Sequence, residues 1–118
     1  MLIQINTDHN IEGREALANH FRGVVESALS LVNDHITRVE VHLSDENGNK
    51  SGPSDQRCLI EARLEGRPPV VVTHHAGTVD EAVNGASAKM ARTIESTLGR
   101  LRDQKNKRTD PPLGEPTD

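Results

Sequence analysis

Three short stretches of the chain alternate apolar and polar residues with the two-residue period of a β-strand. They cover residues 2–6, 36–43 and 57–65, and each therefore has one apolar and one polar face. Residues 69–75 are expected to form a fourth strand, centred on Val70, Val71 and Val72. The apolar positions of the two middle stretches are Val39, Val41, Leu43, Cys58, Ile60, Ala62 and Leu64. A short link that contains Gly66 joins the last two stretches, so we expect them to form a hairpin.

Two longer stretches repeat apolar residues every three or four positions, as an α-helix with one buried face does. The first covers about residues 11–32, and Asn33-Asp34 is expected to end it. Its predicted buried face consists of Leu17, Phe21, Val24, Ala28 and Leu31. The second begins at Thr78, which has capping-box spacing to Glu81, and is expected to end near Gln104. Its apolar stripe consists of Val79, Val83, Ala86, Met90, Ile94, Leu98 and Leu101.

The order of these elements, β-α-β-β-β-α, predicts an α+β fold. We expect a four-stranded sheet with two long helices packed on one face, because the strands have one polar face and each helix has one apolar stripe. Residues 1–106 are expected to form this single domain. Residues 107–118 are acidic and rich in proline, and we expect them to form a disordered tail.

The composition limits the kind of core and the compartment. Phe21 is the only aromatic residue, so the core must consist of branched aliphatic side chains. No stretch is apolar enough for a membrane span, and the N-terminus does not resemble a secretory signal. Cys58 is the only cysteine, which excludes an internal disulfide. These features favour a cytoplasmic protein.

Charge is distributed unevenly along the chain, although the net charge is only −4. Residues 1–88 carry seven basic and thirteen acidic side chains, whereas residues 89–108 carry seven basic and two acidic ones. Residues 109–118 add three acidic side chains. The positive charge is therefore concentrated in the second half of the last helix, and the location of charge indicates more about partners than its average does.

Part of this positive charge shares one helix face. Lys89, Arg92, Ser96 and Arg100 are spaced i, i+3, i+7 and i+11, which places them in a row beside the apolar stripe. Such a row can follow a phosphate backbone. The simpler interpretation is a solvated helix face, with cations favoured near the helix C-terminus.

Neither a metal site nor catalytic chemistry is expected. His74 and His75 are adjacent on a strand and so point to opposite faces, although His42 and one of them could be cross-strand neighbours. Cys58 has no CxxC partner, and the chain has no HExxH, G-x-S-x-G or Walker-type phosphate loop. We therefore expect no metal, no cofactor, no small-molecule substrate and no enzyme activity. The polar stretch 44–55 is expected to be a long loop.

Two segments resemble the ribosome hibernation-promoting factor and ribosome-associated inhibitor family, and the resemblance covers roughly residues 1–105. One is the opening LIQINTDHNIEG, and the other is the last helix, TVDEAVNGASAKMARTIESTLGRLRDQK. The helix matches the family at Asp80-Glu81, Ala82, Val83-Asn84 and Lys89-Met90-Ala91-Arg92. The chain departs from the family at Val24 and Ser27, where the first helix usually carries Arg and Lys, and at Asp80, where an aromatic residue is usual.

The resemblance implies a non-enzymatic stress or stationary-phase protein of ribosome hibernation. Such a protein would regulate translation by binding rRNA of the small subunit, alone or in the 70S ribosome, near the decoding channel. Lys89 and Arg92 match the basic pair of the family's second helix. The residues expected to bind RNA are Lys89, Arg92, Arg100, Arg22, Arg102 and Lys105, and Arg14 lies near the start of the first helix.

Two alternatives remain open from the sequence. The chain could be a protein-interaction module that kept the fold and lost rRNA binding, since its body is acidic. It could also form a homodimer through the open sheet face or an edge strand.

Overall fold

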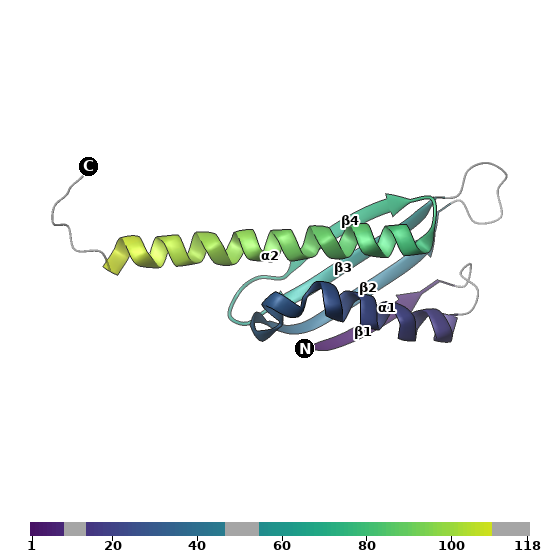
Figure 1. The fold of residues 1–118 in the computed structure, drawn as a ribbon, viewed down its shortest axis with the longest axis horizontal. Helices are drawn as coiled ribbons and strands as arrows, with labels where there is room; N and C mark the ends of the chain where they lie inside the picture. The colour runs from purple at the N-terminus through teal and green to yellow at the C-terminus, as the bar shows by residue number, and fades with distance from the viewer. Residues whose placement is uncertain (9–13, 47–54, 110–118) are drawn as a thin grey trace.

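The structure is a computed structural model that describes residues 1–8, 14–46 and 55–109. Its elements follow the predicted order, with one short 3₁₀ helix added after the first α-helix (Figure 1). They are β1 (Leu2–Thr7), α1 (Arg14–Ala28), η1 (Ser30–His35), β2 (Ile36–Asp45), β3 (Gln56–Leu64), β4 (Val70–Ala76) and α2 (Val79–Thr109). The predicted α+β class is confirmed, and the strand boundaries differ from the expected ones by at most two residues.

The four strands form one mixed sheet in the order β1-β2-β3-β4. β1 runs parallel to β2, because the chain crosses over through α1 before it enters β2, and β2, β3 and β4 form an antiparallel meander. The register pairs Val41 with Ile5 on one side and with Ile60 on the other, and it pairs Ile60 with Val72. One row of apolar side chains thus crosses the whole sheet.

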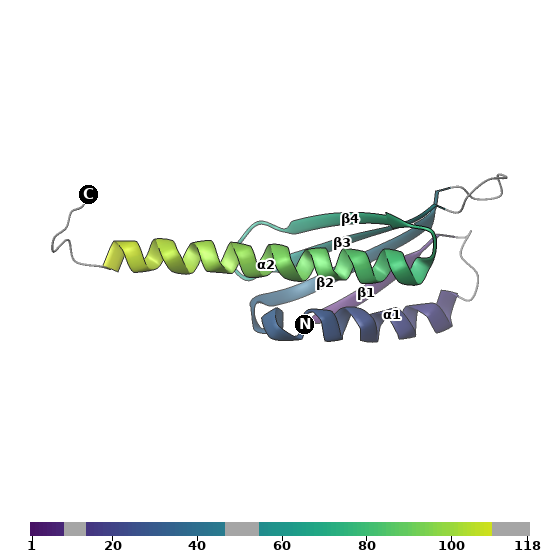
Figure 2. The same cartoon turned by 45° about the horizontal axis from the view of Figure 1, so that its top comes forward.

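Both α-helices cover the same face of this sheet (Figures 1 and 2). The inward-pointing residues predicted for the two middle strands are all buried, with Val39, Val41, Cys58 and Ile60 fully inaccessible to solvent. The helices cover them with the apolar side chains of Phe21, Val25, Leu29, Ala82, Val83, Ala86, Met90 and Ile94. The predicted layer arrangement, two helices on one face and a polar opposite face, is confirmed.

The predicted buried face of the first helix is partly wrong. Phe21 is buried as expected, but Val25 and Leu29 complete its face, while Leu31 is 88% exposed. The α-helix ends at Ala28 instead of continuing to residue 32, and η1 follows. A 3₁₀ helix has three residues per turn in place of 3.6, so the change of period turns Leu31 outward and Val32 inward.

The second helix begins as predicted and runs further than predicted. The Thr78 hydroxyl oxygen accepts a hydrogen bond of 3.1 Å from the Glu81 backbone N–H, which is the N-cap bond of a capping box. The helix continues to Thr109, past the expected end near Gln104, and its C-terminal end extends beyond the sheet (Figure 1). Of the expected disordered tail at 107–118, residues 107–109 belong to this helix, which corrects the predicted boundary, and residues 110–118 lie outside the described residues. Most of the expected loop at 44–55 also lies outside them. No helix in the described part is apolar enough over its length to span a bilayer.

Gly85 allows α2 to approach β4 closely. A β-carbon at this position would overlap the ring of His74, which points toward the helix from β4. By contrast, a β-carbon at Gly99 would meet nothing within 4 Å. The two glycines of one helix therefore differ in their surroundings and offer a matched comparison.

We expect Gly85→Ala to destabilise the protein and Gly99→Ala to stabilise it. Either substitution gains about 1 kcal/mol of helix propensity. At Gly85 this gain is outweighed by overpacking against His74, which typically costs about 1–3 kcal/mol. Denaturant unfolding of both variants measures the difference. Equal stabilisation by the two substitutions would contradict the close contact between α2 and β4.

Cys58 is a buried filler of the core rather than a reactive group. Burial raises the pKa of its thiol from the ordinary value of 9.0 to about 12, against a smaller lowering by Arg57. The thiolate is the nucleophilic form of cysteine, so the thiol of the folded protein is expected to be inert at neutral pH.

The same shift makes stability depend on pH in the alkaline range. The unfolded chain releases the thiol proton above about pH 9, whereas the folded chain keeps it until about pH 12. The contribution of the neutral thiol is therefore complete below pH 9 and is lost between pH 9 and pH 12. We expect the stability advantage of the wild type over Cys58→Ala to shrink in this window, as measured by denaturant unfolding at several pH values. A constant difference up to about pH 11 would contradict the burial of this thiol.

Candidate nucleic-acid interface

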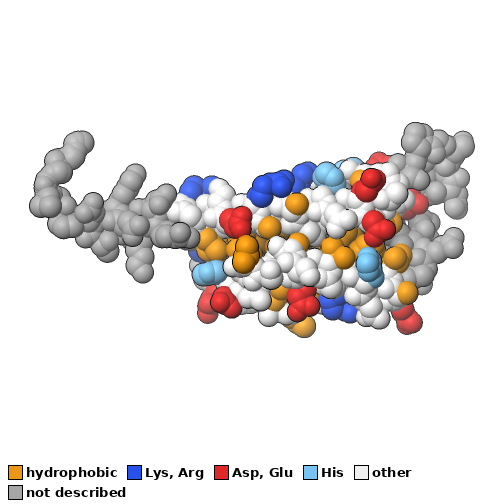
Figure 3. Space-filling model, in the orientation of Figure 1, with side chains coloured by type: hydrophobic (Ala, Val, Ile, Leu, Met, Phe, Trp, Pro, Cys, Tyr) orange, Lys and Arg blue, Asp and Glu red, His pale blue; other side chains and the backbone are white. Residues whose placement is uncertain are grey.

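The cations predicted on one face of the last helix line a groove between α2 and β4. The groove, which we call the basic groove, has a volume of about 320 Å³. Its lining residues are Val72, Lys89, Arg92, Thr93, Ser96 and Arg100. All but Val72 come from α2, where their three- and four-residue spacing stacks them along one face. The structure thus brings together three of the six predicted RNA-binding residues, and blue side chains gather over α2 and β4 along the upper edge in Figure 3.

Lys89 has an internal partner that the sequence could not indicate. Its Nζ donates a hydrogen bond of 2.9 Å to the backbone carbonyl oxygen of Thr73 in β4, and the residue is only partly exposed. β4 is an edge strand, so this bond also satisfies one of its carbonyl groups. An ammonium group has three N–H donors, which leaves two of them for an outside acceptor. Lys89 therefore joins α2 to the sheet and still adds positive charge to the groove.

Arg92 and Arg100 are the exposed cations of the groove. The Arg100 guanidinium donates to the hydroxyl oxygens of Ser96 at 3.1 Å and Thr97 at 3.4 Å, which are neutral acceptors. Among the side chains that the structure describes, no carboxylate forms an ion pair with Lys89, Arg92 or Arg100. Their charge is therefore not cancelled by these carboxylates, and a planar guanidinium suits bidentate contact with phosphate.

Arg22 does not join this groove. Its Nε donates to the backbone oxygen of Ile3 in β1 at 3.4 Å, and its Nη1 donates to the Asn19 side-chain oxygen at 2.8 Å. β1 and β4 are the opposite edges of the sheet, so Arg22 and the Lys89 row lie on opposite flanks of the molecule. The structure therefore does not bring Arg22 together with Lys89, Arg92 and Arg100. The side chains of Arg14, Arg102 and Lys105 lie outside the described part.

The polar face of the sheet neutralises much of its own charge. Arg38 donates to the Gln4 side-chain oxygen at 2.6 Å and forms an ion pair of 3.1 Å with Glu40. Glu40 also lies 3.5 Å from His42 Nε2. Because Arg38 is already paired with a carboxylate, this part of the face is a poorer site for a polyanion than the groove of α2.

The histidines do not assemble a metal site in the described part of the chain. His42 in β2 and His74 in β4 are separated by the whole of β3, so the suggested cross-strand pairing of histidines is wrong. His75 lies 2.9 Å from an Asp55 carboxylate oxygen at the surface. No group of three or more His, Cys, Asp or Glu residues among the described residues is placed to hold a metal ion.

Comparison with known families gives one match over most of the chain. Residues 3–102 match the family described as Sigma 54 modulation protein / S30EA ribosomal protein. The match coincides with the predicted resemblance over residues 1–105 and confirms it. No curated protein sequence matches the chain significantly.

Two solved structures share the fold. A ribosomal subunit interface protein from Coxiella burnetii has a TM-score of 0.63 at 14% identity, over 84% of this chain and 99% of its own. The N-terminal domain of Protein Y from Thermus thermophilus has a TM-score of 0.65 at 18% identity, over 82% of this chain and 99% of its own. At these identities the likeness establishes the arrangement of helices and strands.

Proposed function

Because the chain belongs to the Sigma 54 modulation protein / S30EA ribosomal protein family, we propose that it associates with the ribosome and inhibits translation. It would bind rRNA of the small subunit near the decoding channel and exclude the normal ligands of that channel. The shared fold with a ribosomal subunit interface protein from Coxiella burnetii supports this proposal. The action is steric, so no catalytic residue is required, and its place is the cytoplasm under conditions of stress or stationary phase.

The observation that carries the proposal is the groove of α2 and β4 with its three cations. Lys89, Arg92 and Arg100 supply positive charge in a row, without described carboxylates to pair it. A polyanion responds to the local field rather than to the net charge of the protein, so a chain of net charge −4 can still bind RNA through one flank.

The number of cations sets how steeply the binding affinity is expected to fall as the salt concentration rises. Each phosphate that a protein neutralises contributes roughly 0.7–0.9 to the slope of log affinity against log salt concentration. Three contacts would therefore give a slope of roughly 2–3. Val24 and Ser27 stand where the first helix of the family usually carries cations, so the described residues support phosphate contacts along one helix rather than two.

Co-sedimentation with purified 30S and 70S particles tests the proposal. We expect the chain to pellet with the particles at low salt and to be released progressively as salt is raised to a moderate concentration. The full chain alone, centrifuged under the same conditions, is the control for aggregation. The absence of pelleting with either particle at every salt concentration would overturn the proposal.

A second candidate function is a protein-interaction module of the same fold. The acidic balance of residues 1–88 and the attachment of Arg22 to β1 favour it. The partner would meet the polar sheet face, where Glu61 and Arg63 are available beside the Arg38 network. Charge reversal in the groove distinguishes the two functions. Arg92→Glu with Arg100→Glu removes an RNA interaction and leaves a sheet-face interaction unchanged.

A further inference from the structure

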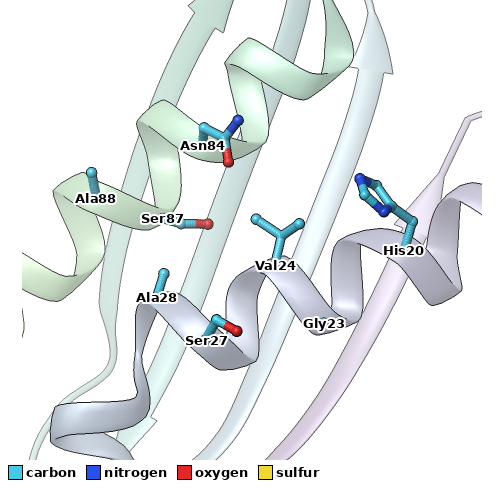
Figure 4. Close-up of a pocket in the computed structure, with 8 residues that line it drawn as sticks. All are labelled: His20, Gly23, Val24, Ser27, Ala28, Asn84, Ser87 and Ala88. Atoms are coloured by element: carbon cyan, nitrogen blue, oxygen red, sulfur yellow. The ribbon is translucent and has the colours of Figure 1, made fainter.

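A second hollow lies between the two helices, on the side of α2 that faces α1. It has a volume of about 620 Å³, which is within the usual range for small-molecule sites. Figure 4 shows Val24 and Ala28 of α1 pointing toward Asn84 and Ser87 of α2. His20 and Ala88 lie at the margins of this interhelix groove, and the other lining residues have small or uncharged side chains.

Ser87 is the feature of this groove that packing does not explain. Its side chain is only 1% exposed, and its hydroxyl oxygen has no hydrogen-bond partner in the described part of the protein. Buried polar groups are nearly always paired, because an unpaired one loses its hydration without compensation. Figure 4 shows this oxygen pointing from α2 toward α1, into the groove. The hydroxyl is therefore unpaired but itself buried, so a group that pairs with it has to reach the floor of the groove, between the two helices.

The lining also indicates which chemistry fits. None of the eight lining residues is Lys, Arg, Asp or Glu, so the groove itself does not select an ionic group. Val24, Ala28 and Ala88 offer apolar contact, while the Asn84 amide and the Ser87 hydroxyl each supply both a donor and an acceptor. This combination matches a flat, uncharged ring with a polar edge.

We propose that the interhelix groove holds an unpaired nucleobase of an RNA strand. The Asn84 amide and the Ser87 hydroxyl hydrogen-bond the polar edge of the base, and the apolar side chains cover its faces. RNA is commonly recognised in this way, through single-stranded bases that leave the stack and present their edges. The identity of the ligand as RNA rests on the proposed function, whereas the site itself rests on Ser87 and the shape of the groove.

The position of the groove next to the cations supports the same ligand. Ala88 lines the interhelix groove and the following residue, Lys89, lines the basic groove. Arg92 lies four residues after Ala88 and so is its neighbour on the helix surface. Only the ridge of α2 separates the two grooves. One strand can therefore place a phosphate at Arg92 and a base in the interhelix groove, which a ligand without phosphates would not do.

Titration of the full chain with the four free nucleosides, followed by backbone amide NMR, tests the groove without requiring a ribosome. We expect at least one nucleoside to cause saturable shifts at residues 23–28 and 84–88. Ser87→Ala should weaken that binding about two- to tenfold, the effect of one net hydrogen bond. Since the hydroxyl has no partner among the described residues of the free protein, this variant is expected to fold normally.

A blocking variant and its matched control make the test specific. Ala88→Leu places a larger side chain at the margin of the groove and should abolish the saturable shifts. Ala16→Leu is the same change at an exposed alanine of α1 that does not line the groove, and it should leave them unchanged. Equal nucleoside binding by wild type, Ser87→Ala and Ala88→Leu would overturn the inference.

The outcomes also separate this inference from the proposed function. Nucleoside binding that Ala88→Leu abolishes supports the groove even if the chain does not sediment with ribosomes, and only the proposed function then fails. Sedimentation without any nucleoside shifts overturns the groove and leaves the proposed function standing. A dimer in light scattering that Ala88→Leu dissociates would overturn the inference too, because the groove would then be an interface between copies of the chain.

Discussion

Replacing Phe21 by alanine is expected to lower the free energy of unfolding by about 3–5 kcal/mol. Phe21 is the only aromatic side chain, is 1% exposed, and lies in the core between α1 and the sheet. Its removal leaves a cavity that branched aliphatic neighbours cannot fill without backbone movement. A loss of this size is a large share of the stability of a small domain. Thermal unfolding should show the melting temperature reduced by more than about 10 °C.

Leu31→Ala is the matched control for this prediction. The periodic pattern of the sequence assigns Leu31 to the same buried face, but in the structure it is 88% exposed. The substitution is therefore expected to change stability by less than about 0.5 kcal/mol. Comparable losses of unfolding free energy for Phe21→Ala and Leu31→Ala would contradict this structure, because they would mean that α1 continues through residue 31 in place of η1.

Reversing both exposed cations of the basic groove, Arg92→Glu with Arg100→Glu, is expected to weaken binding to the small subunit about a hundredfold or more. Hydrogen bonds to charged groups contribute about 1.5–3 kcal/mol each, and a factor of ten corresponds to about 1.4 kcal/mol. Two lost contacts reach this magnitude even before repulsion by the new carboxylates is counted. The salt slope should also fall by roughly 1.5, because two phosphates are no longer neutralised. Sedimentation over a range of salt concentrations measures both effects.

The control for this variant must change the net charge equally. Arg63→Glu with Arg67→Glu does so at two exposed arginines of β3 and the following turn, outside the residues that line the groove. We expect this control to reduce affinity only slightly through the overall field. If both pairs weaken binding to the same extent, net charge rather than the groove governs association. Lys89 is left unchanged in both variants because its bond to Thr73 makes it structural.

The sheet could be predicted from the sequence because a strand has an exact two-residue period. Inward positions such as Val41 and Ile60 follow from alternation alone, and a shift of one residue would have placed every apolar side chain in water. The parallel pairing of β1 with β2 does not follow from alternation, because the period of a strand carries no information about the direction of its neighbour.

The first helix was predicted less accurately, since a broad apolar stripe does not reveal its centre. Val24 and Val25 are adjacent, and either can belong to a stripe that contains Phe21. In the structure Val25 is fully buried in the core, while Val24 faces α2 across the interhelix groove. The short η1 segment then changes the period, which the sequence does not signal strongly.

The row of cations on α2 could be predicted from the sequence, but the contacts of these side chains could not. The spacing of Lys89, Arg92 and Arg100 places them on one face of any helix that contains them. That Lys89 bonds a backbone carbonyl of β4, and that Arg22 is held at the opposite edge, depends on the packing of helices on the sheet. The unpaired Ser87 hydroxyl is likewise visible only in the folded chain, among the residues that the structure describes.

Electron cryomicroscopy of the full chain bound to the 30S subunit tests most directly whether the groove of α2 and β4 contacts rRNA. We expect density for the chain in the decoding channel, with the guanidinium groups of Arg92 and Arg100 in contact with rRNA phosphates. A complex in which the groove of α2 and β4 faces solvent, and the chain is held through its sheet face or by a ribosomal protein, would contradict this expectation.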